Sequence, residues 1–261
     1  MIVAVLQMQP APADVEANLA QIAAAARSAA LSGAALLVAP EMAVTGYAIW
    51  DDIARLAEPR DGPTASRLSA LARDARIAVL AGLPEREGSA IYNAAALAGP
   101  DGATRFYRKC HLYGPREKAA FTPGSGLSPV FEVGAMRAGL CVCYDAEFPE
   151  TARSLALAGA DLLLVPTALP RSGPNDRVSR TLIPARALEN HMFVAYAGLC
   201  GQENGQAYQG GSVIVGQDGE DLARAGLGPA LLLAKLERNA HGGGEPDPYL
   251  TDRRPELYRL S

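Results

Sequence analysis

The chain is poor in the residue types that mark several protein classes. Its 261 residues include only 4 cysteines, 3 histidines and 1 tryptophan. Four cysteines are too few for a disulfide scaffold, and a chain of this length needs none. No uncharged apolar run approaches the roughly 18 residues expected of a membrane-spanning helix. The N-terminal residues MIVAVLQMQP also lack the charged start and long apolar stretch of a signal peptide, so we expect a cytoplasmic protein.

Positive charge is neither abundant nor clustered. The chain has 24 Lys and Arg against 28 Asp and Glu, with a formal net charge of -4. A surface that binds nucleic acid or anionic lipid would call for clustered positive charge. We therefore expect neither nucleic acid nor a membrane as a partner. Lysine is scarce, so Lys109 in YRKCHL is a candidate functional cation, although a solvated charge at a strand end is the plainer interpretation.

Short patterns for metals and nucleotides are missing as well. His111, His191 and His241 lie far apart in sequence, and the CVC at 141–143 is a poor ligand set alone. The chain contains no Walker A, GxGxxG or GxSxG sequence. We expect no metal and no cofactor.

Apolar patterns of helix and strand alternate along the chain, which favours an α/β fold. Asp14 is the predicted N-cap of the first helix, and the turn at 99–102 predicts a hairpin, so the sheet should be mixed. Helices are expected over 14–31, 64–75 and 176–190 and from 149 onward. Strands are expected over 2–6, 35–39, 77–81, 91–97, 104–107, 130–133, 137–143, 162–165, 192–199, 212–215 and 231–236.

No repeat, low-complexity tract or Ser/Gly linker divides the chain. We therefore expect a single domain over residues 1–261. The tail 242–261 is rich in Gly, Pro and charge, which is unlike core sequence, and we expect it to pack at a subunit interface.

Three predicted strands stop abruptly at polar residues. LLVAPE ends in Glu41, GLCVCYD ends in 143–145, and DLLLVPT ends in Thr167. In open α/β sheets, ligands collect beyond the carboxyl ends of strands. A further run, VLAGLPE, ends in Glu85, so a Pro-Glu pair after a strand is weak support alone.

Cysteine at 143 has two interpretations. Cysteine is among the most often buried residues, and period-two spacing would place Cys141 and Cys143 on one face of a strand. Cys143 differs because it comes just before a predicted helix start at 148–150. A thiol at a strand-to-helix turn can be reached by substrate, and backbone N–H groups there can point at a developing oxyanion.

Three separated motifs occur in the order found in one family. They are PEMAVTGY at 40–47, YRKCHLYGPREKAAFTPG at 107–124 and GLCVCYDAEFPE at 139–150. The chain resembles the nitrilase superfamily of carbon-nitrogen hydrolases, and PARALEN at 184–190 with YLTDRRPELY at 249–258 extends the likeness over nearly the whole chain. The resemblance implies a four-layer α-β-β-α sandwich with mixed sheets, assembled as a homodimer or larger homo-oligomer.

The resemblance also implies a catalytic set. A Glu-Lys-Cys triad falls on Glu41, Lys109 and Cys143, and a second glutamate that positions substrate and nucleophile falls on Glu117. The backbone N–H of Tyr144 would stabilise the oxyanion together with Lys109.

Four residues are expected to contact the substrate: Tyr47, Glu147, Thr167 and Ala168. Many relatives have arginine where this chain has Glu147. An acidic residue there favours an amine-bearing substrate if it faces the pocket, whereas a structural ion pair is the plainer interpretation.

The predicted activity is hydrolysis of a small carboxamide to a carboxylic acid and ammonia, through a cysteine thioester that water then cleaves. CYDxEFPE resembles the stand-alone amidase branch. Because related triads serve other substrates, nitrile hydrolysis and N-carbamoyl amide hydrolysis stay open. A catalytically silent binding protein of the same fold is the alternative from a different class.

Overall fold

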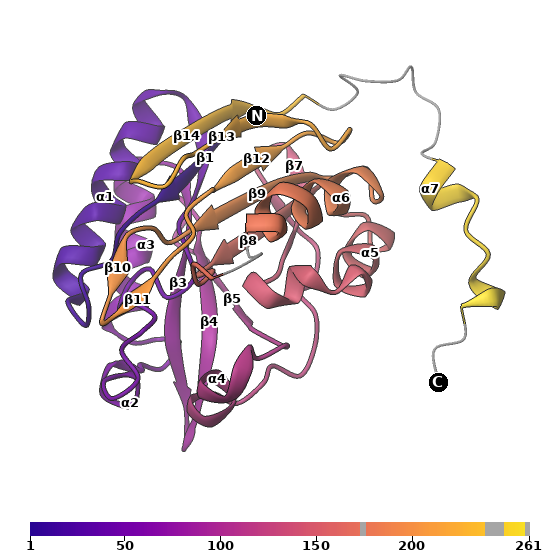
Figure 1. Ribbon diagram of the computed structural model, residues 1–261. Coiled ribbons are helices and arrows are strands. Elements are labelled where there is room, and N and C mark those ends of the chain that lie inside the picture. Colours follow the sequence, from indigo (N-terminus) through magenta and orange to yellow (C-terminus); the bar gives the residue numbers. More distant parts are fainter. Residues whose placement is uncertain (173–175, 238–247, 259–261) are drawn as a thin grey trace.

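The computed structural model describes residues 1–172, 176–237 and 248–258. Two large mixed sheets form the centre of the molecule (Figure 1). In spatial order, the first contains β14 (Ala230–Lys235), β1 (Ile2–Gln7), β2 (Ala34–Val38), β3 (Ala78–Glu87), β4 (Ala90–Ala98) and β5 (Thr104–Arg108). The second contains β13 (Asp221–Arg224), β12 (Val213–Val215), β9 (Phe193–Gly198), β8 (Leu162–Thr167), β7 (Met136–Leu140) and β6 (Phe131–Val133). A small hairpin joins β10 (Gln202–Glu203) to β11 (Gln206–Ala207).

Helices cover the outer faces of the two sheets (Figure 1). The helices are α1 (Val15–Leu31), α2 (Ile53–Leu56), α3 (Pro63–Ala75), α4 (Gly114–Ala120), α5 (Pro149–Leu157), α6 (Ile183–Leu188) and α7 (Pro248–Thr251). The described residues also form two 3-10 turns, η1 (Cys143–Glu147) and η4 (Pro255–Leu257), and one π-helical turn, η3 (Val178–Leu182). The predicted cap is present, because Asp14 Oδ1 accepts a hydrogen bond from the Ala17 N–H at 2.9 Å.

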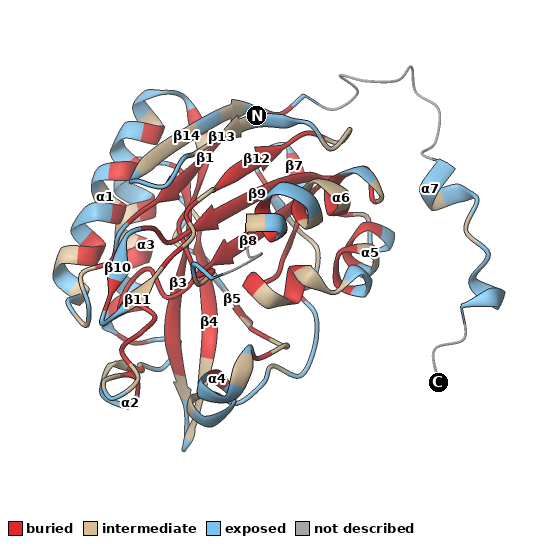
Figure 2. Cartoon of the chain, in the orientation of Figure 1, coloured by how far each residue is buried: buried red, intermediate tan, exposed pale blue. Residues whose placement is uncertain are grey.

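Strand periodicity separates the apolar residues into layers. Val3 and Val5 of β1 face the other sheet, whereas the alternate residues Ala4 and Leu6 pack in the cluster that contains α1 and α3. On β8, Leu162 and Leu164 likewise face the first sheet, and Leu163 and Val165 pack with α5 and α6. Figure 2 shows the resulting buried centre and the exposed outer faces of the helices. The predicted four-layer α-β-β-α sandwich with mixed sheets is confirmed.

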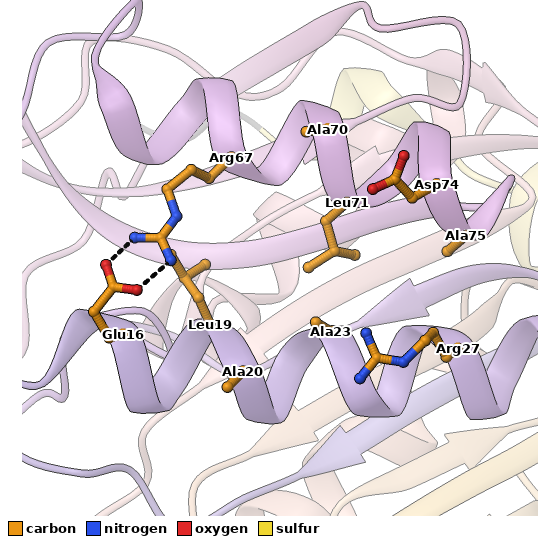
Figure 3. Close-up of a pocket in the computed structure, with 10 residues that line it drawn as sticks. All are labelled: Glu16, Leu19, Ala20, Ala23, Arg27, Arg67, Ala70, Leu71, Asp74 and Ala75. Atoms are coloured by element: carbon orange, nitrogen blue, oxygen red, sulfur yellow. Dashed lines mark hydrogen bonds and ion pairs between the residues drawn. The ribbon is translucent and has the colours of Figure 1, made fainter.

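A surface groove runs between α1 and α3 on the outside of the first sheet. Its floor is lined mainly by small apolar side chains, and Arg67 pairs with Glu16 at one end (Figure 3). Neither this pair nor the facing Arg27 and Asp74 provides a nucleophile. The groove is therefore a feature of helix packing and does not bring reactive groups together.

The predicted elements that were wrong in extent include the strand over 77–81 and the helix over 176–190. The strand expected over 77–81 continues as β3 to Glu87 and forms a hairpin with β4, because Arg60 and Arg108 neutralise Glu85 inside the strand. The helix expected over 176–190 is interrupted: η3 precedes α6, whose second residue, Pro184, has no N–H to continue the α-helical bonding pattern.

The C-terminal segment contributes little to the core. None of the described residues of α7 and η4 is buried, and α7 is joined to α5 by a hydrogen bond from Arg153 Nη1 to the Tyr249 carbonyl at 3.1 Å. Residues 242–247 and 259–261 of the predicted tail lie outside the described residues. The expected subunit contact of this tail stays a prediction.

Candidate active site

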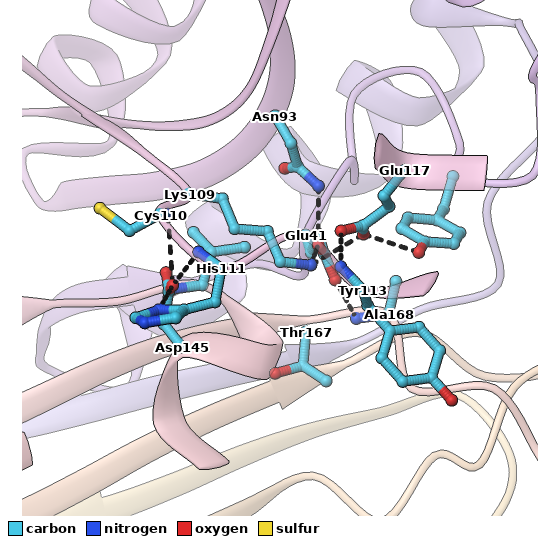
Figure 4. A network of polar contacts seen from close by, with 12 residues as sticks. Glu41, Asn93, Lys109, Cys110, His111, Tyr113, Glu117, Asp145, Thr167 and Ala168 are labelled. Atoms are coloured by element: carbon cyan, nitrogen blue, oxygen red, sulfur yellow. Dashed lines mark hydrogen bonds and ion pairs between the residues drawn. The ribbon is translucent and has the colours of Figure 1, made fainter. Parts of the chain in front are cut away.

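Residues from both sheets meet at one edge of the sandwich. Glu41 follows β2 and Lys109 directly follows β5 in the first sheet, whereas Cys143 lies beyond β7 and Ala168 directly follows β8 in the second. Glu117 lies on α4, a short helix that the sequence patterns did not predict. Figure 4 shows Glu41, Lys109, Glu117 and Ala168 converging on one polar network.

The Glu41 loop is held tightly against β3. The Gly82 N–H donates to the Pro40 carbonyl at 3.0 Å, and the Val44 N–H donates to the Gly82 carbonyl at 3.1 Å. A Cβ at Gly82 would lie 2.2 Å from the Met42 nitrogen, so only glycine allows this approach. Glu41 is consequently carried by a rigid segment.

Both carboxylate oxygens of Glu41 are engaged. Oε1 accepts hydrogen bonds from Lys109 Nζ and from Asn93 Nδ2, each at 2.8 Å, and Oε2 accepts one from the Ala168 N–H at 2.7 Å. These donors come from three different parts of the chain. The carboxylate is therefore oriented before any substrate arrives.

Lys109 lies between two glutamates. Its Nζ also donates to Glu117 Oε1 at 2.8 Å, and the side chains of Lys109, Glu41 and Glu117 are all fully buried. Glu117 is fixed in turn by the Tyr47 hydroxyl at 2.7 Å and by the Tyr113 N–H at 2.6 Å. The two carboxylates use two of the three ammonium donors of Lys109, which leaves one for another acceptor.

Burial and charge set the ionisation of this network. Burial raises the pKa of Glu41, and although Lys109 opposes this shift, the net direction is upward. Burial alone would lower the pKa of Lys109, but Glu41, Cys143 and Glu117 together raise it above its usual value. Lys109 therefore stays a cation, and Glu41 is a better proton acceptor than an exposed glutamate.

Cys143 does not end a strand as expected. The strand β7 ends at Leu140, and Cys143 begins η1 with a φ of 49°, a left-handed conformation that is uncommon for a residue with a side chain. This turn also separates the two cysteines that period-two spacing placed on one face. Cys143 packs in the cluster between the sheets, whereas Cys141 packs beneath α5 and α6.

The Cys143 side chain lies at a cavity and is nearly buried. Cys143 is 8 % exposed, whereas Cys141 is fully buried and is not among the described residues that line this cavity. Burial, followed by the negative charge of Glu41, raises the pKa of the Cys143 thiol well above its ordinary value, against the opposing effects of Lys109 and the Ala168 N–H. At neutral pH the sulfur is therefore a protonated thiol.

Asp145 ties the Lys109 loop to the Cys143 turn. Its Oδ1 accepts from the His111 N–H at 2.8 Å and contacts His111 Nδ1 at 2.7 Å (Figure 4). Its Oδ2 accepts from the Tyr107 hydroxyl at 2.9 Å and from the Val142 N–H at 3.0 Å. Asp145 is fully buried. It holds the elements that carry the cation and the thiol in one arrangement.

The cavity at Cys143 has a volume of about 260 Å³. Three of the predicted substrate contacts, Tyr47, Glu147 and Ala168, line it, as does Tyr144, the predicted oxyanion residue. Thr167 does not: it is fully buried, and its hydroxyl donates to the Val165 carbonyl at 3.3 Å. The structure thus brings together every predicted site residue except the Thr167 side chain.

The family profile described as carbon-nitrogen hydrolase matches residues 2–242. The chain belongs to the carbon-nitrogen hydrolase family.

Known proteins of several kinds resemble this carbon-nitrogen hydrolase. A Pseudomonas protegens protein named "Hydrolase in pqqF 5'region" is 45% identical, with 99% of this chain and 90% of the relative covered. A Pyrococcus abyssi protein named nitrilase is 35% identical, with 98% of each chain covered. An amidase from Nesterenkonia sp. AN1, solved with acrylamide added to its active-site cysteine, has a TM-score of 0.90 and 41% identity, with 99% of this chain and 98% of the other covered.

Among the described residues of this carbon-nitrogen hydrolase, no group of three or more His, Cys, Asp or Glu side chains is arranged to hold a metal ion. No described helix has the length and apolar character needed to cross a membrane.

Sequence reasoning missed Asn93 and Asp145 as parts of the site. Asn93 is in the middle of β4, where an amide looks like an ordinary strand residue, and only the fold brings it to Glu41. Asp145 stands inside the CYD motif, where a buried acidic residue could have been suspected from the apolar run before it.

Proposed function

We propose that this carbon-nitrogen hydrolase cleaves small carboxamides to a carboxylic acid and ammonia. The observation that carries the proposal is the arrangement at the cavity: a thiol at its wall, a buried carboxylate with a raised pKa, and a buried ammonium held between two glutamates. These are the nucleophile, the proton acceptor and the oxyanion partner that acyl transfer to cysteine needs.

In the first half-reaction, the Cys143 sulfur attacks the amide carbon while its proton passes to Glu41. Because the pKa of Cys143 is raised, a preformed thiolate would be rare, so proton transfer should accompany the attack. Lys109 and the backbone N–H of Tyr144 stabilise the oxyanion, a contribution of about 3 kcal/mol for a typical donor. Glu41 then donates the proton to the nitrogen, the C–N bond breaks, and ammonia leaves a thioester.

In the second half-reaction, water attacks the thioester carbon while Glu41 accepts a proton from it. The C–S bond breaks, the carboxylic acid leaves, and the proton on Glu41 returns to the sulfur. One carboxylate thus serves both half-reactions, and the scheme predicts ping-pong kinetics. The hydrogen bonds from Asn93 and Ala168 keep Glu41 in place between the two steps.

A matched substrate panel tests the proposal. Butanamide, butanenitrile and an N-carbamoyl amine are each incubated with the enzyme, and ammonia, carbon dioxide and organic products are measured. We expect ammonia and butanoic acid from butanamide, and a hydroxamate when hydroxylamine intercepts the thioester. The Cys143→Ala variant should release no ammonia. Absence of turnover and of any acyl adduct on Cys143 in the intact enzyme would contradict the proposal.

Nitrile hydrolysis is the second candidate. It is favoured by the similarity to the Pyrococcus abyssi protein named nitrilase. In that reaction Cys143 would add to the nitrile carbon and form a thioimidate. Turnover of butanenitrile without turnover of butanamide would indicate nitrile hydrolysis. Release of carbon dioxide from the N-carbamoyl compound would indicate N-carbamoyl amide hydrolysis.

A further inference from the structure

The cavity at Cys143 has an unusual combination of walls. Its lining contains three tyrosines and one carboxylate close to the thiol, and no lysine or arginine side chain forms its surface among the described residues. The residues that matter here are Tyr47, Tyr113, Tyr144, Glu147, Cys143 and Ala168.

The Glu147 carboxylate is half-buried at this wall and has no hydrogen bond or ion pair with the described residues. The structural ion pair that the sequence left open therefore does not form within residues 1–172, 176–237 and 248–258. Arg186, the nearby cation, donates instead to the backbone carbonyls of Ala146 at 3.0 Å and Glu147 at 2.8 Å, and pairs with Glu189 at 2.9 Å. A carboxylate at a pocket wall without a partner is costly to desolvate, and a ligand cation would offset that cost.

The charges around the cavity also favour a cationic ligand over an anionic one. Lys109 is already shared by Glu41 and Glu117, so the third carboxylate, Glu147, has no cation of its own in the pocket. Burial raises the pKa of Glu147, while Lys109 and Arg186 act against that shift only at a distance. An anionic substrate would meet repulsion here, whereas an ammonium group would find an unpaired carboxylate.

The aromatic walls are compatible with a cation. Tyr113 and Tyr144 pack edge to face with their ring centroids 5.2 Å apart. Tyrosine rings attract ammonium groups through their negative faces, and this attraction strengthens when the cation is desolvated. Figure 4 shows the Tyr113 ring pointing away from the Glu41 network, while the Tyr113 N–H donates to Glu117 Oε2 at 2.6 Å.

We propose that the substrates of this enzyme are small amides that carry an ammonium group a few bonds from the scissile carbonyl, and that Glu147 is the residue that selects them. The inference rests on the proposed amidase function. Cys143 and Glu147 are the two ends of one η1 turn, so a compact substrate can reach both. Glu147 takes no part in bond breaking. It binds the part of the substrate that does not react.

The experiment compares three amides of nearly equal size: 3-aminopropanamide, which carries a cation, neutral butanamide, and anionic malonamate. Ammonia release gives kcat/KM for each. We expect 3-aminopropanamide to exceed butanamide by about tenfold or more, with malonamate the poorest, since a factor of ten is the ordinary scale of one added charged contact. In Glu147→Gln, the ratio of kcat/KM for 3-aminopropanamide to kcat/KM for butanamide should fall by about tenfold.

Glu150→Gln is the matched control, because it removes the same charge from an exposed residue three positions along the chain. Its substrate ratio should equal that of the unmodified enzyme. The melting temperature shows whether Glu147→Gln folds. If it does not fold, inhibition of the unmodified enzyme tests whether the pocket prefers a cation. Propylammonium should then inhibit butanamide hydrolysis more strongly than 1-propanol does.

The outcomes separate the two proposals. Hydrolysis of butanamide with no preference for 3-aminopropanamide, or with a preference that Glu147→Gln leaves intact, overturns the role of Glu147 and leaves the amidase proposal standing. Equal inhibition by propylammonium and 1-propanol overturns it as well. No ammonia from any of the three amides, and no acyl adduct on Cys143, would instead reject the amidase function on which the inference rests.

Discussion

The Ala168 N–H donates to Glu41 Oε2 at 2.7 Å, across 127 positions in the sequence and between the two sheets. Glu41 belongs to the loop after β2 in the first sheet, and Ala168 directly follows β8 in the second. The same Ala168 N–H also favours negative charge on Cys143. One backbone donor therefore serves both Glu41 and Cys143, so the relative position of the two side chains depends on how the sheets pack.

Replacing the nucleophile should abolish turnover without unfolding the protein. We expect Cys143→Ala to lower kcat by about 10⁴-fold or more, because no other thiol lines the cavity among the described residues. Cys141→Ala is the control, because Cys141 packs under α5 and α6 and should be dispensable for the chemistry. Ammonia release and circular dichroism measure the two effects. Equal losses in both variants would contradict the assignment.

Removing the proton acceptor should be nearly as damaging. Glu41→Gln keeps the shape of the side chain but cannot take a proton from sulfur or water, so we expect kcat to fall by about 10²- to 10⁴-fold. Glu132→Gln, on the exposed face of β6, is the matched control. Single-turnover acylation followed by mass spectrometry shows whether the loss occurs before the thioester. Full activity in Glu41→Gln would require a different base.

The acid side of the pH profile should report Glu41. Its pKa is raised above 4.5 by burial, and the reaction needs the ionised carboxylate. We therefore expect kcat/KM to fall as pH decreases through a value above 4.5. The profile is measured with butanamide, and circular dichroism at each pH confirms that the fold persists. An acid limb at or below 4.5 would show that another group controls the reaction.

Asp145 should be important for both stability and activity. It is fully buried and accepts hydrogen bonds from His111, Tyr107 and Val142, so Asp145→Asn replaces an acceptor with an amide that repels some of these donors. Loss of one such partner costs about 1–3 kcal/mol. Urea unfolding gives the change in free energy, and kcat should fall with it. Asp101→Asn, in an exposed turn, should cost less than about 1 kcal/mol.

Stability should decline in alkali. The folded-state pKa values of Cys143 and Lys109 are raised above their ordinary values of 9.0 and 10.5, so the folded protein retains protons that the unfolded chain releases. Their contribution is complete below those ordinary values and is lost as pH rises through the folded-state pKa values, at up to about 1.4 kcal/mol per pH unit for each proton. Urea unfolding at about pH 9 to 10 should show a shallower decline in Cys143→Ala. Identical slopes would contradict this linkage.

Much of the fold could be predicted from local patterns. Short apolar runs located most of the strands, and Asp14 located the start of α1 correctly. The four layers came from the family resemblance, because a continuous apolar run indicates that a strand is buried on both faces but not what covers each face. Glu85 misled the interpretation of β3, because its partners Arg60 and Arg108 come from segments that lie elsewhere in the sequence.

The residues proposed to react were predicted from motifs, but the side chains that hold them in place were not. Glu41, Lys109 and Cys143 stand in recognisable sequences, whereas Asn93 becomes significant only when β4 is placed beside the Glu41 loop. The left-handed turn at Cys143 was also outside the reach of periodicity, since a strand pattern that continues through 141–143 conceals the change of direction.

The division of the site between the sheets has a practical consequence for protein engineering. Glu41, Lys109 and Glu117 all precede the connection from α4 to β6, whereas Cys143 and Ala168 follow it, and β14 from the later part completes the earlier sheet. Dividing the gene at this connection would place Glu41 and Cys143 on separate polypeptides. Each fragment alone should be inactive, so ammonia production would indicate that the two fragments had reassembled. The enzyme could therefore serve as a template for a split reporter.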